Sequence, residues 1–148
     1  AARADLEALR GKAAIANAKL AYRHYQELSG SPRWKKLAAA GARPQRLLWA
    51  STGSKNPAYR DVVYVEELVG ADTVNTLPPA TLDAFIDHGV ARASLTEDVD
   101  AARRELETLA RHGISLDAVT DRLLDEGVRL FAEAFDKLLG AVRAQAKA

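Results

Sequence analysis

The chain has 148 residues, of which 48% are hydrophobic and 28% are charged, and its formal net charge is +1 at pH 7. This balance is typical of one folded domain, and it excludes a disordered chain and a basic surface that would bind nucleic acid through its phosphates. The sequence contains no cysteine, which excludes disulfides and thiolate metal sites, and no apolar run of the ~20 residues that a membrane-spanning helix needs. We therefore expect a cytoplasmic chain with neither a nucleic acid nor a membrane as partner.

The sequence also lacks methionine, and it opens directly in a helical pattern. A protein translated in full begins with methionine. The sequence therefore predicts that this chain is part of a longer protein.

Two helical patterns fill the first 41 residues. Apolar and small residues recur at helical spacing over residues 5–28, which predicts one long helix, and its basic residues, Lys19 among them, lie off this face and are expected in solvent. Ser31, followed by proline, is a suitable cap for a second helix over residues 33–40. We expect Trp34 to pack between the two helices.

Short apolar runs at residues 45–50 and 73–77, bounded by turn residues, predict two buried strands. A helix is expected over residues 78–88, directly after the second run. This alternation of strand and helix is typical of a parallel sheet. Two strands are too few for a stable sheet, so the pattern also predicts a missing neighbour.

The segment between these strands, residues 61–70, is ambiguous because its valines and tyrosine favour a strand by propensity. Its apolar residues nevertheless fall at helical spacing. Asp61 can cap a helix and Gly70 can end one, so we predict a helix.

The last third of the chain predicts two further helices. Thr96 is expected to cap a helix that ends near residue 111, and Ser115 to cap a long amphipathic helix after it. Gly127 is a candidate for a bend or a break in that last helix.

The loop that follows the first strand carries the chemistry of an anion site. It reads Ser51-Thr52-Gly53-Ser54-Lys55, so that small residues, hydroxyl groups and one lysine follow the carboxyl end of a buried strand. Small residues let backbone N–H groups approach an anion, hydroxyls donate hydrogen bonds and lysine supplies charge. An ordinary polar turn with an exposed lysine is the alternative.

No catalytic or metal-binding set is evident elsewhere in the sequence. The histidines, His24, His88 and His112, lack partners at metal-ligand spacing. Adjacent charged residues such as Glu66 and Glu67 point apart on a helix and make no catalytic pair. We therefore predict no catalytic residue and no metal on this chain.

Several long motifs closely resemble the long-chain bacterial transaldolases and the similar domain of transaldolase–glucose-6-phosphate isomerase fusions. The motifs are LLWASTGSKNPAY (47–59), YVEEL (64–68), DTVNTLPPATL (72–82) and DHG (87–89), with LRGKAAIANA (9–18) upstream of them. The resemblance covers essentially the whole chain.

The resemblance implies an α/β fold, namely the C-terminal portion of an eight-stranded (β/α) barrel with two short parallel strands and a predominantly helical remainder. Within residues 1–148, it assigns helices to 1–41, the last two βα units to 42–95 and C-terminal helices to 96–148. The implied partners are a sugar-phosphate substrate and the N-terminal remainder of the barrel.

The family transfers a dihydroxyacetone unit between phosphorylated sugars of the pentose phosphate pathway through a lysine Schiff base, with no cofactor. Its Schiff-base lysine lies on a middle strand, in a segment that this chain lacks. The lysines present are expected on helix surfaces or in the tail, where they are poor nucleophiles: Lys12, Lys19, Lys35, Lys36, Lys137 and Lys147.

What carries over to this chain is the loop after the first strand. Gly53, Ser54 and Lys55 match the family's sugar-phosphate grip, and Ser51 and Thr52 are further candidates. The family often has arginine where this sequence has lysine, which keeps the charge but loses the bidentate geometry. The competing interpretation is a non-catalytic, mainly helical packing or docking module.

Overall fold

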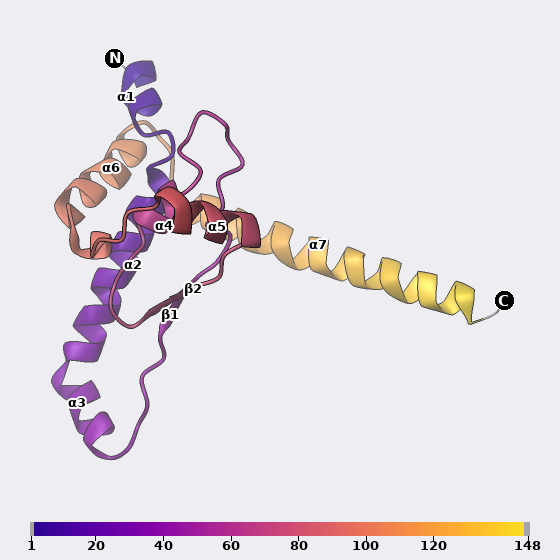
Figure 1. The fold of residues 1–148 in the computed structure, drawn as a ribbon, viewed down its shortest axis with the longest axis horizontal. Helices are drawn as coiled ribbons and strands as arrows, with labels where there is room; N and C mark the ends of the chain where they lie inside the picture. The colour runs from indigo at the N-terminus through magenta and orange to yellow at the C-terminus, as the bar shows by residue number, and fades with distance from the viewer. Residues whose placement is uncertain (1, 147–148) are drawn as a thin grey trace. The chain divides into compact units, whose positions relative to one another are not determined.

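The computed structural model describes residues 2–146 and divides into two units, the first ending at Thr108 and the second beginning at Leu109. Figure 1 shows their helices and strands. The elements of the first unit are α1 (Ala2–Ala8), α2 (Ala13–Gly30), α3 (Pro32–Ala39), β1 (Leu47–Trp49), α4 (Val63–Glu66), β2 (Thr73–Asn75), α5 (Pro79–His88), the 3-10 helix η1 (Ser94–Thr96) and most of α6 (Val99–Arg111). The second unit holds the end of α6 and the helix α7 (Leu116–Gln145).

The two predicted strands form a parallel pair, as the alternation of strand and helix indicated. Leu47 pairs with Thr73, and the register continues to Trp49 opposite Asn75. The backbone N–H of Thr76 then donates to the carbonyl of Trp49 over 2.9 Å, which carries the ladder one residue past β2. The carboxyl ends of both strands therefore lie side by side, in the α/β arrangement that the sequence predicted.

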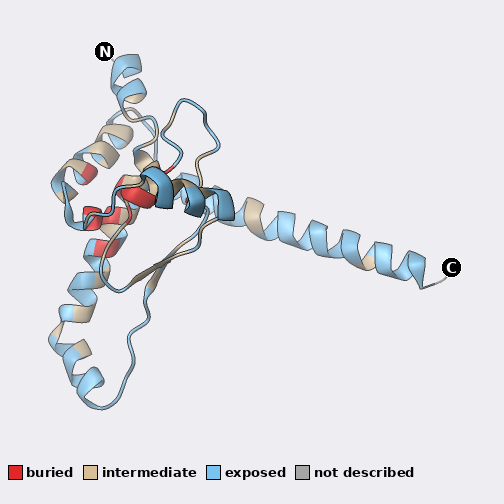
Figure 2. Cartoon of the chain, viewed as in Figure 1, coloured by how far each residue is buried: buried red, intermediate tan, exposed pale blue. Residues whose placement is uncertain are grey.

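A small core lies between α2, the end of α4 and η1. Tyr22, Leu68 and Leu95 are buried against one another, and Leu47 and Trp49 of β1 pack on them. Figure 2 shows in red the buried positions of the chain, several of which lie on α2 and on neighbouring segments. Leu48, between Leu47 and Trp49 on β1, faces away from the core and is 56% exposed. The prediction that both strands are buried is therefore wrong for the chain by itself, since the other residues of β1 and those of β2 are only half-buried.

The single helix predicted over residues 5–28 is wrong at its start. The helix is interrupted after Ala8, and Gly11 adopts φ +75°, a left-handed conformation that glycine tolerates best. A Cβ at Gly11 would lie 3.3 Å from the ring of Tyr59, so this turn packs tightly against a distant segment.

The helix predicted over residues 61–70 forms, but only as the short α4. Asp61 does not cap it, because the Asp61 carboxylate instead pairs with His88 over 2.9 Å. Past α4, Gly70 lies so close to Leu95 that a Cβ would meet its side chain at 2.6 Å. A side chain at position 70 would therefore collide with Leu95, and Gly70 lies four residues past the end of α4.

Of the other three predicted helix caps, two are confirmed and one is wrong. Ser31 accepts a hydrogen bond from the backbone N–H of Trp34, and Ser115 accepts one from Ala118, each over 3.2 Å. Thr96 does not cap α6, since it belongs to η1 and its hydroxyl donates to the carbonyl of Ala93. The predicted helix at residues 78–88 is confirmed as α5, with Gly89 as its C-cap.

The helix α7 continues through Gly127 without a break, so the prediction that Gly127 divides this helix is wrong. Its apolar side chains are largely exposed, Phe131 to 82%. The others at least half exposed are Leu123, Leu124, Val128, Leu130, Phe135, Leu138 and Val142. Within residues 2–146, no helix is both long and apolar enough to cross a membrane.

Candidate functional site

The loop after β1 begins with a strained residue and a buried one. Ser51 adopts φ 58°, a left-handed conformation that is uncommon for a residue other than glycine. Thr52 is 3% exposed, and its hydroxyl donates to the side-chain oxygen of Asn75 over 2.7 Å. Because Asn75 ends β2, this bond fastens the loop of one strand to the end of its neighbour.

Gly53 allows the loop to pass against the start of α5. A Cβ at this position would lie 2.9 Å from the hydroxyl oxygen of Thr81 and 3.5 Å from a ring carbon of Pro78. The contact with Thr81 is closer than real side chains allow, so only glycine fits unless the Thr81 side chain rotates or α5 moves. The loop therefore lies at the amino end of a helix, where the dipole favours anions.

Ser54 and Lys55 form the outer part of the loop. The Ser54 hydroxyl donates weakly to the carbonyl of Asn56 over 3.4 Å, and the Asn56 side chain in turn accepts from the backbone N–H of Ala58. Lys55 is exposed, and among residues 2–146 its ammonium has neither a hydrogen bond nor an ion pair. The loop thus presents an unpaired cation beside a serine hydroxyl.

The structure keeps the five predicted site residues on one loop but gives them different surroundings. Gly53 and Ser54 are half-buried, whereas Ser51 and Lys55 are exposed. The hydrogen of the Thr52 hydroxyl is already used in the bond to Asn75. Lys55, the Ser51 hydroxyl and the adjacent end of α5 are groups whose chemistry suits an anion, whereas Ser54 would first give up its weak bond to Asn56.

Sequence reasoning missed the residues that hold this loop, Asn75 and Thr81. One signal was available for Asn75, a side-chain amide that ends an otherwise β-branched run, where asparagine is disfavoured unless it has a partner. No local signal marks Thr81, which is important only because the loop passes against it.

A cluster of charged side chains lies at the end of the same loop, next to α4 and the C-terminus of α5. Arg60 binds the Glu66 carboxylate with two nitrogens, over 3.0 and 2.9 Å, and donates a third hydrogen bond to the carbonyl of His88 over 2.8 Å. The hydrogen bond from Arg60 holds the pKa of Glu66 below its usual value. The backbone N–H of Val90 also donates to Glu66, over 3.0 Å.

His88 lies between two carboxylates at the end of α5. Its Nε2 is 2.9 Å from Asp61 and its Nδ1 is 3.1 Å from Asp87. Asp61, and next Asp87, raise the pKa of His88, while His88 lowers the pKa of Asp61. The two carboxylates flanking His88 lie 1 and 27 residues away in the sequence, and the more distant one could not be inferred from spacing within α5.

Lys19 is the clearest correction among the lysines, since it was expected in solvent and is 7% exposed. Its ammonium lies 3.1 Å from Glu67 and donates to the carbonyl of Glu97. Arg92 pairs with the same Glu67 carboxylate. Burial alone would raise the pKa of Glu67, but the hydrogen bonds from Arg92 and Lys19 outweigh it and lower that pKa.

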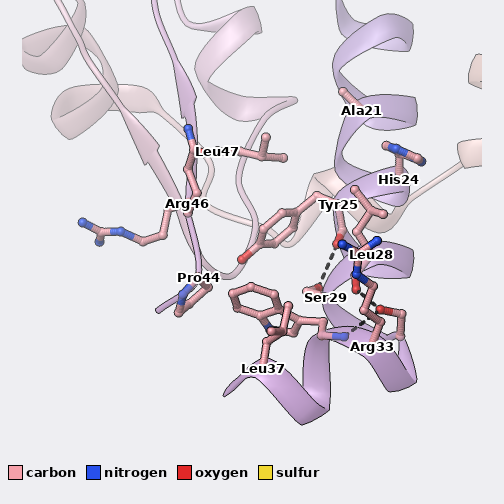
Figure 3. A pocket seen from close by; sticks show the side chains of 13 residues that line it. Ala21, His24, Tyr25, Leu28, Ser29, Arg33, Leu37, Pro44, Arg46 and Leu47 are labelled. Atoms are coloured by element: carbon pink, nitrogen blue, oxygen red, sulfur yellow. Dashed lines mark hydrogen bonds between the residues drawn. The ribbon is translucent and has the colours of Figure 1, made fainter. Parts of the chain in front are cut away.

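A hollow of about 670 Å³ lies between α2, α3 and the approach to β1, as Figure 3 shows. Tyr25, Leu37 and Leu47 contribute apolar walls. Trp34, which was expected to pack between the two helices, is half-buried and lines this hollow. No residue of the loop 51–56 lines it, so it is separate from the candidate site. Among residues 2–146, no three histidine, aspartate or glutamate side chains gather as a metal site would need.

Comparison with known proteins identifies relatives over nearly the whole chain. The family model described as transaldolase/fructose-6-phosphate aldolase matches residues 1–142. A protein of Neisseria meningitidis serogroup C named transaldolase is 53% identical over 131 residues, which is 88% of this chain and 37% of that protein.

Two further proteins named transaldolase agree with this match. That of Parafrankia is 50% identical over 140 residues, covering 94% of this chain and 38% of the relative. That of Thiobacillus denitrificans is 53% identical over 134 residues, covering 90% and 37%. The chain therefore spans less than two fifths of the length of these relatives.

Proposed function

Because the chain belongs to the transaldolase/fructose-6-phosphate aldolase family, we propose that it is the C-terminal part of a transaldolase. The intact enzyme would transfer a dihydroxyacetone unit between phosphorylated sugars through a lysine Schiff base. The role of this chain would be to bind the phosphate end of the sugar. The observation that carries this role is the unpaired Lys55 on a loop fastened across the carboxyl ends of β1 and β2.

The fold supports a barrel with further strands. Parallel strands are normally covered on both faces and flanked by others, whereas Leu48 of β1 is 56% exposed. We assign residues 42–95 to the last two βα units of such a barrel, with helices 1–41 before them and 96–148 after them. The N-terminal remainder of the barrel is the partner that would cover the exposed apolar side chains of β1 and α7. This accounts for the exposed face of α7 without a separate docking function.

The location of the loop suits a phosphate. Barrel enzymes hold substrates at the carboxyl ends of their strands, and phosphate groups frequently bind near the last two. In this proposal Lys55 supplies the charge, Ser54 and Ser51 donate hydrogen bonds, and Gly53 keeps the loop close to α5. Thr52 fastens the loop through Asn75 and leaves its outer neighbours free to bind.

The surroundings of the lysines support a Schiff-base lysine elsewhere in the polypeptide. Lys12, Lys35, Lys36 and Lys137 are exposed, and the buried Lys19 is bonded to the Glu67 carboxylate and to the backbone carbonyl of Glu97. A lysine nucleophile must be desolvated and not already bonded to a carboxylate, and none of these environments meets both conditions. Lys147 lies outside the described residues.

The test is a Lys55→Ala substitution in the full-length enzyme. The KM for glyceraldehyde 3-phosphate should rise roughly 10- to 100-fold, because a charge-assisted hydrogen bond contributes ~1.5–3 kcal/mol. The KM for unphosphorylated glyceraldehyde should stay nearly constant. Lys36→Ala, at an exposed lysine of α3, is the matched control and should change neither value. Equal effects of Lys55→Ala on both substrates would refute the phosphate role.

Borohydride trapping tests the second part of the proposal. Reduction of the full-length enzyme in the presence of fructose 6-phosphate should label one lysine, and peptide mapping should place it outside residues 1–148. A label on Lys19 or any other lysine of this chain would contradict the assignment.

A further inference from the structure

The loop between β1 and α4 is held by side-chain hydrogen bonds at both of its ends. At the near end, Thr52 is bonded to Asn75 on β2. At the far end, Arg60 and Asp61 are bonded to the last turn of α5, 27 or 28 residues further along the chain. Residues 53–59 therefore form an arc with both ends fixed to the second βα unit.

Glu66 is the centre of the far attachment. It is 8% exposed, and its carboxylate takes two hydrogen bonds from Arg60 and one from the backbone N–H of Val90. The guanidinium of Arg60 also donates a hydrogen bond to the carbonyl of His88. One guanidinium thus links the end of the loop, the first turn after it and the C-terminus of α5.

Only arginine can make this set of bonds. Its planar guanidinium presents donors in a fixed fork that matches a carboxylate and still leaves one for a carbonyl. A lysine would keep the charge but would lose the two-point contact that fixes direction. The charge of Arg60 alone therefore does not account for these three hydrogen bonds. Their geometry indicates that they fix the direction of the loop.

We infer that Arg60 and Glu66 are positioning residues. They fix the arc 53–59, and with it Ser54 and Lys55, in the conformation that binds a phosphate monoester. This inference rests on the proposed phosphate role of the loop. A loop that is already ordered loses little conformational freedom when the ligand binds, so its affinity is higher than that of a mobile loop. Neither residue needs to touch the substrate to have this effect.

The test uses Arg60→Lys and Glu66→Gln in the full-length enzyme. Arg60→Lys keeps the charge, and Glu66→Gln keeps the size and an oxygen that can accept from Val90. We expect the KM for glyceraldehyde 3-phosphate to rise about tenfold in each, with kcat and the KM for glyceraldehyde little changed. Arg23→Lys is the matched control, because Arg23 pairs with Glu27 on the exposed surface of α2.

Limited trypsin digestion gives a second measurement that does not depend on catalysis. Trypsin cuts after Lys55 only when the arc is loose enough to enter its active site, and Arg60→Lys leaves a trypsin site at both positions. We expect cleavage after Lys55 to accelerate about tenfold in both variants and not in Arg23→Lys. Glu66→Gln decides the matter if Arg60→Lys fails to fold.

Faster cleavage after Lys55 together with a selective rise in the KM for the phosphorylated substrate would support the inference. Unchanged cleavage in both variants would overturn it, even where Lys55→Ala shows that the loop binds phosphate. Faster cleavage without any change in KM would also overturn it, because the attachment would then be structural only. Failure of Lys55→Ala to discriminate the substrates would instead refute the proposed function itself.

Discussion

The hydroxyl of Thr52 and the side-chain oxygen of Asn75 are 2.7 Å apart, and this hydrogen bond joins the carboxyl ends of β1 and β2. It is partly buried, since Thr52 is only 3% exposed and Asn75 is half-buried. The bond spans two parallel strands whose regular pairing extends over three residues each. It therefore contributes to the stability of the strand pair as well as to the direction in which the loop leaves it.

Replacement of Thr52 by valine should test this bond. Valine has nearly the same shape, so the main change is that the Asn75 oxygen loses its donor in a partly buried place. We expect the free energy of unfolding of the full-length protein to fall by about 1–3 kcal/mol, measured by urea denaturation. Thr96→Val is the control, because the Thr96 hydroxyl is bonded to a carbonyl at an exposed position and its loss should cost little. Equal losses in the two variants would show that burial of the bond has no special value.

The contact between Gly53 and Thr81 makes a second prediction. Gly53→Ala places a methyl group 2.9 Å from the Thr81 hydroxyl, and this overpacking should destabilise the protein by roughly 1–3 kcal/mol. Thr81→Ala removes the obstructing oxygen, so the double variant should recover much of the loss. A double-mutant cycle by urea denaturation measures this recovery.

Gly127→Ala controls for the general effect of exchanging glycine for alanine. A Cβ at Gly127 meets no atom within 4 Å, and the residue lies inside α7, where alanine is the better helix former. This variant should be stabilised by about 0.5–1 kcal/mol. If Gly53→Ala is as destabilising with Thr81→Ala as without it, the contact is not the cause.

Local patterns predicted the elements of the fold well where their causes are local. The two separate strand segments, α5 with Gly89 at its end, and the caps at Ser31 and Ser115 each depend on residues within a few positions of each other. Spacing of apolar residues and the hydrogen-bonding ability of short polar side chains determine such features. The candidate site residues at 51–55 could be proposed because they are contiguous, and their role stays a prediction.

The errors share a different cause, which is competition from distant partners. Asp61 looks like a helix cap, yet His88, 27 residues away, takes its carboxylate. Lys19 lies off the apolar face of its helix, yet it is buried because Glu67 and a carbonyl at Glu97 surround it. Spacing within a helix cannot reveal such partners, and the same limit hid the roles of Asn75 and Arg60 beside the candidate site.

The pair of Asp61 and His88 makes stability depend on pH in a definite direction. The folded protein raises the pKa of His88 above its ordinary value of 6.5, chiefly through Asp61 and then Asp87. The stability that His88 contributes is therefore fully present below pH 6.5 and is lost as the pH rises through the raised value. The pKa of Asp61 is lowered from 3.8, so its contribution is fully present above pH 3.8 and is lost as the pH falls through the lowered value.

The interaction should therefore be strongest between pH 3.8 and pH 6.5. We expect His88→Gln to lower the melting temperature of the full-length protein more at a pH of about 5.5 than at a pH of about 9, where the wild-type imidazole is neutral. Because both groups are at the surface, the difference should shrink in high salt. Asp61→Asn provides the matched variant, and in its background the pH dependence of the His88→Gln effect should become smaller, leaving only the part due to Asp87. A difference in melting temperature that stays constant from a pH of about 5.5 to a pH of about 9 would show that the charged form of the His88–Asp61 pair does not stabilise the protein.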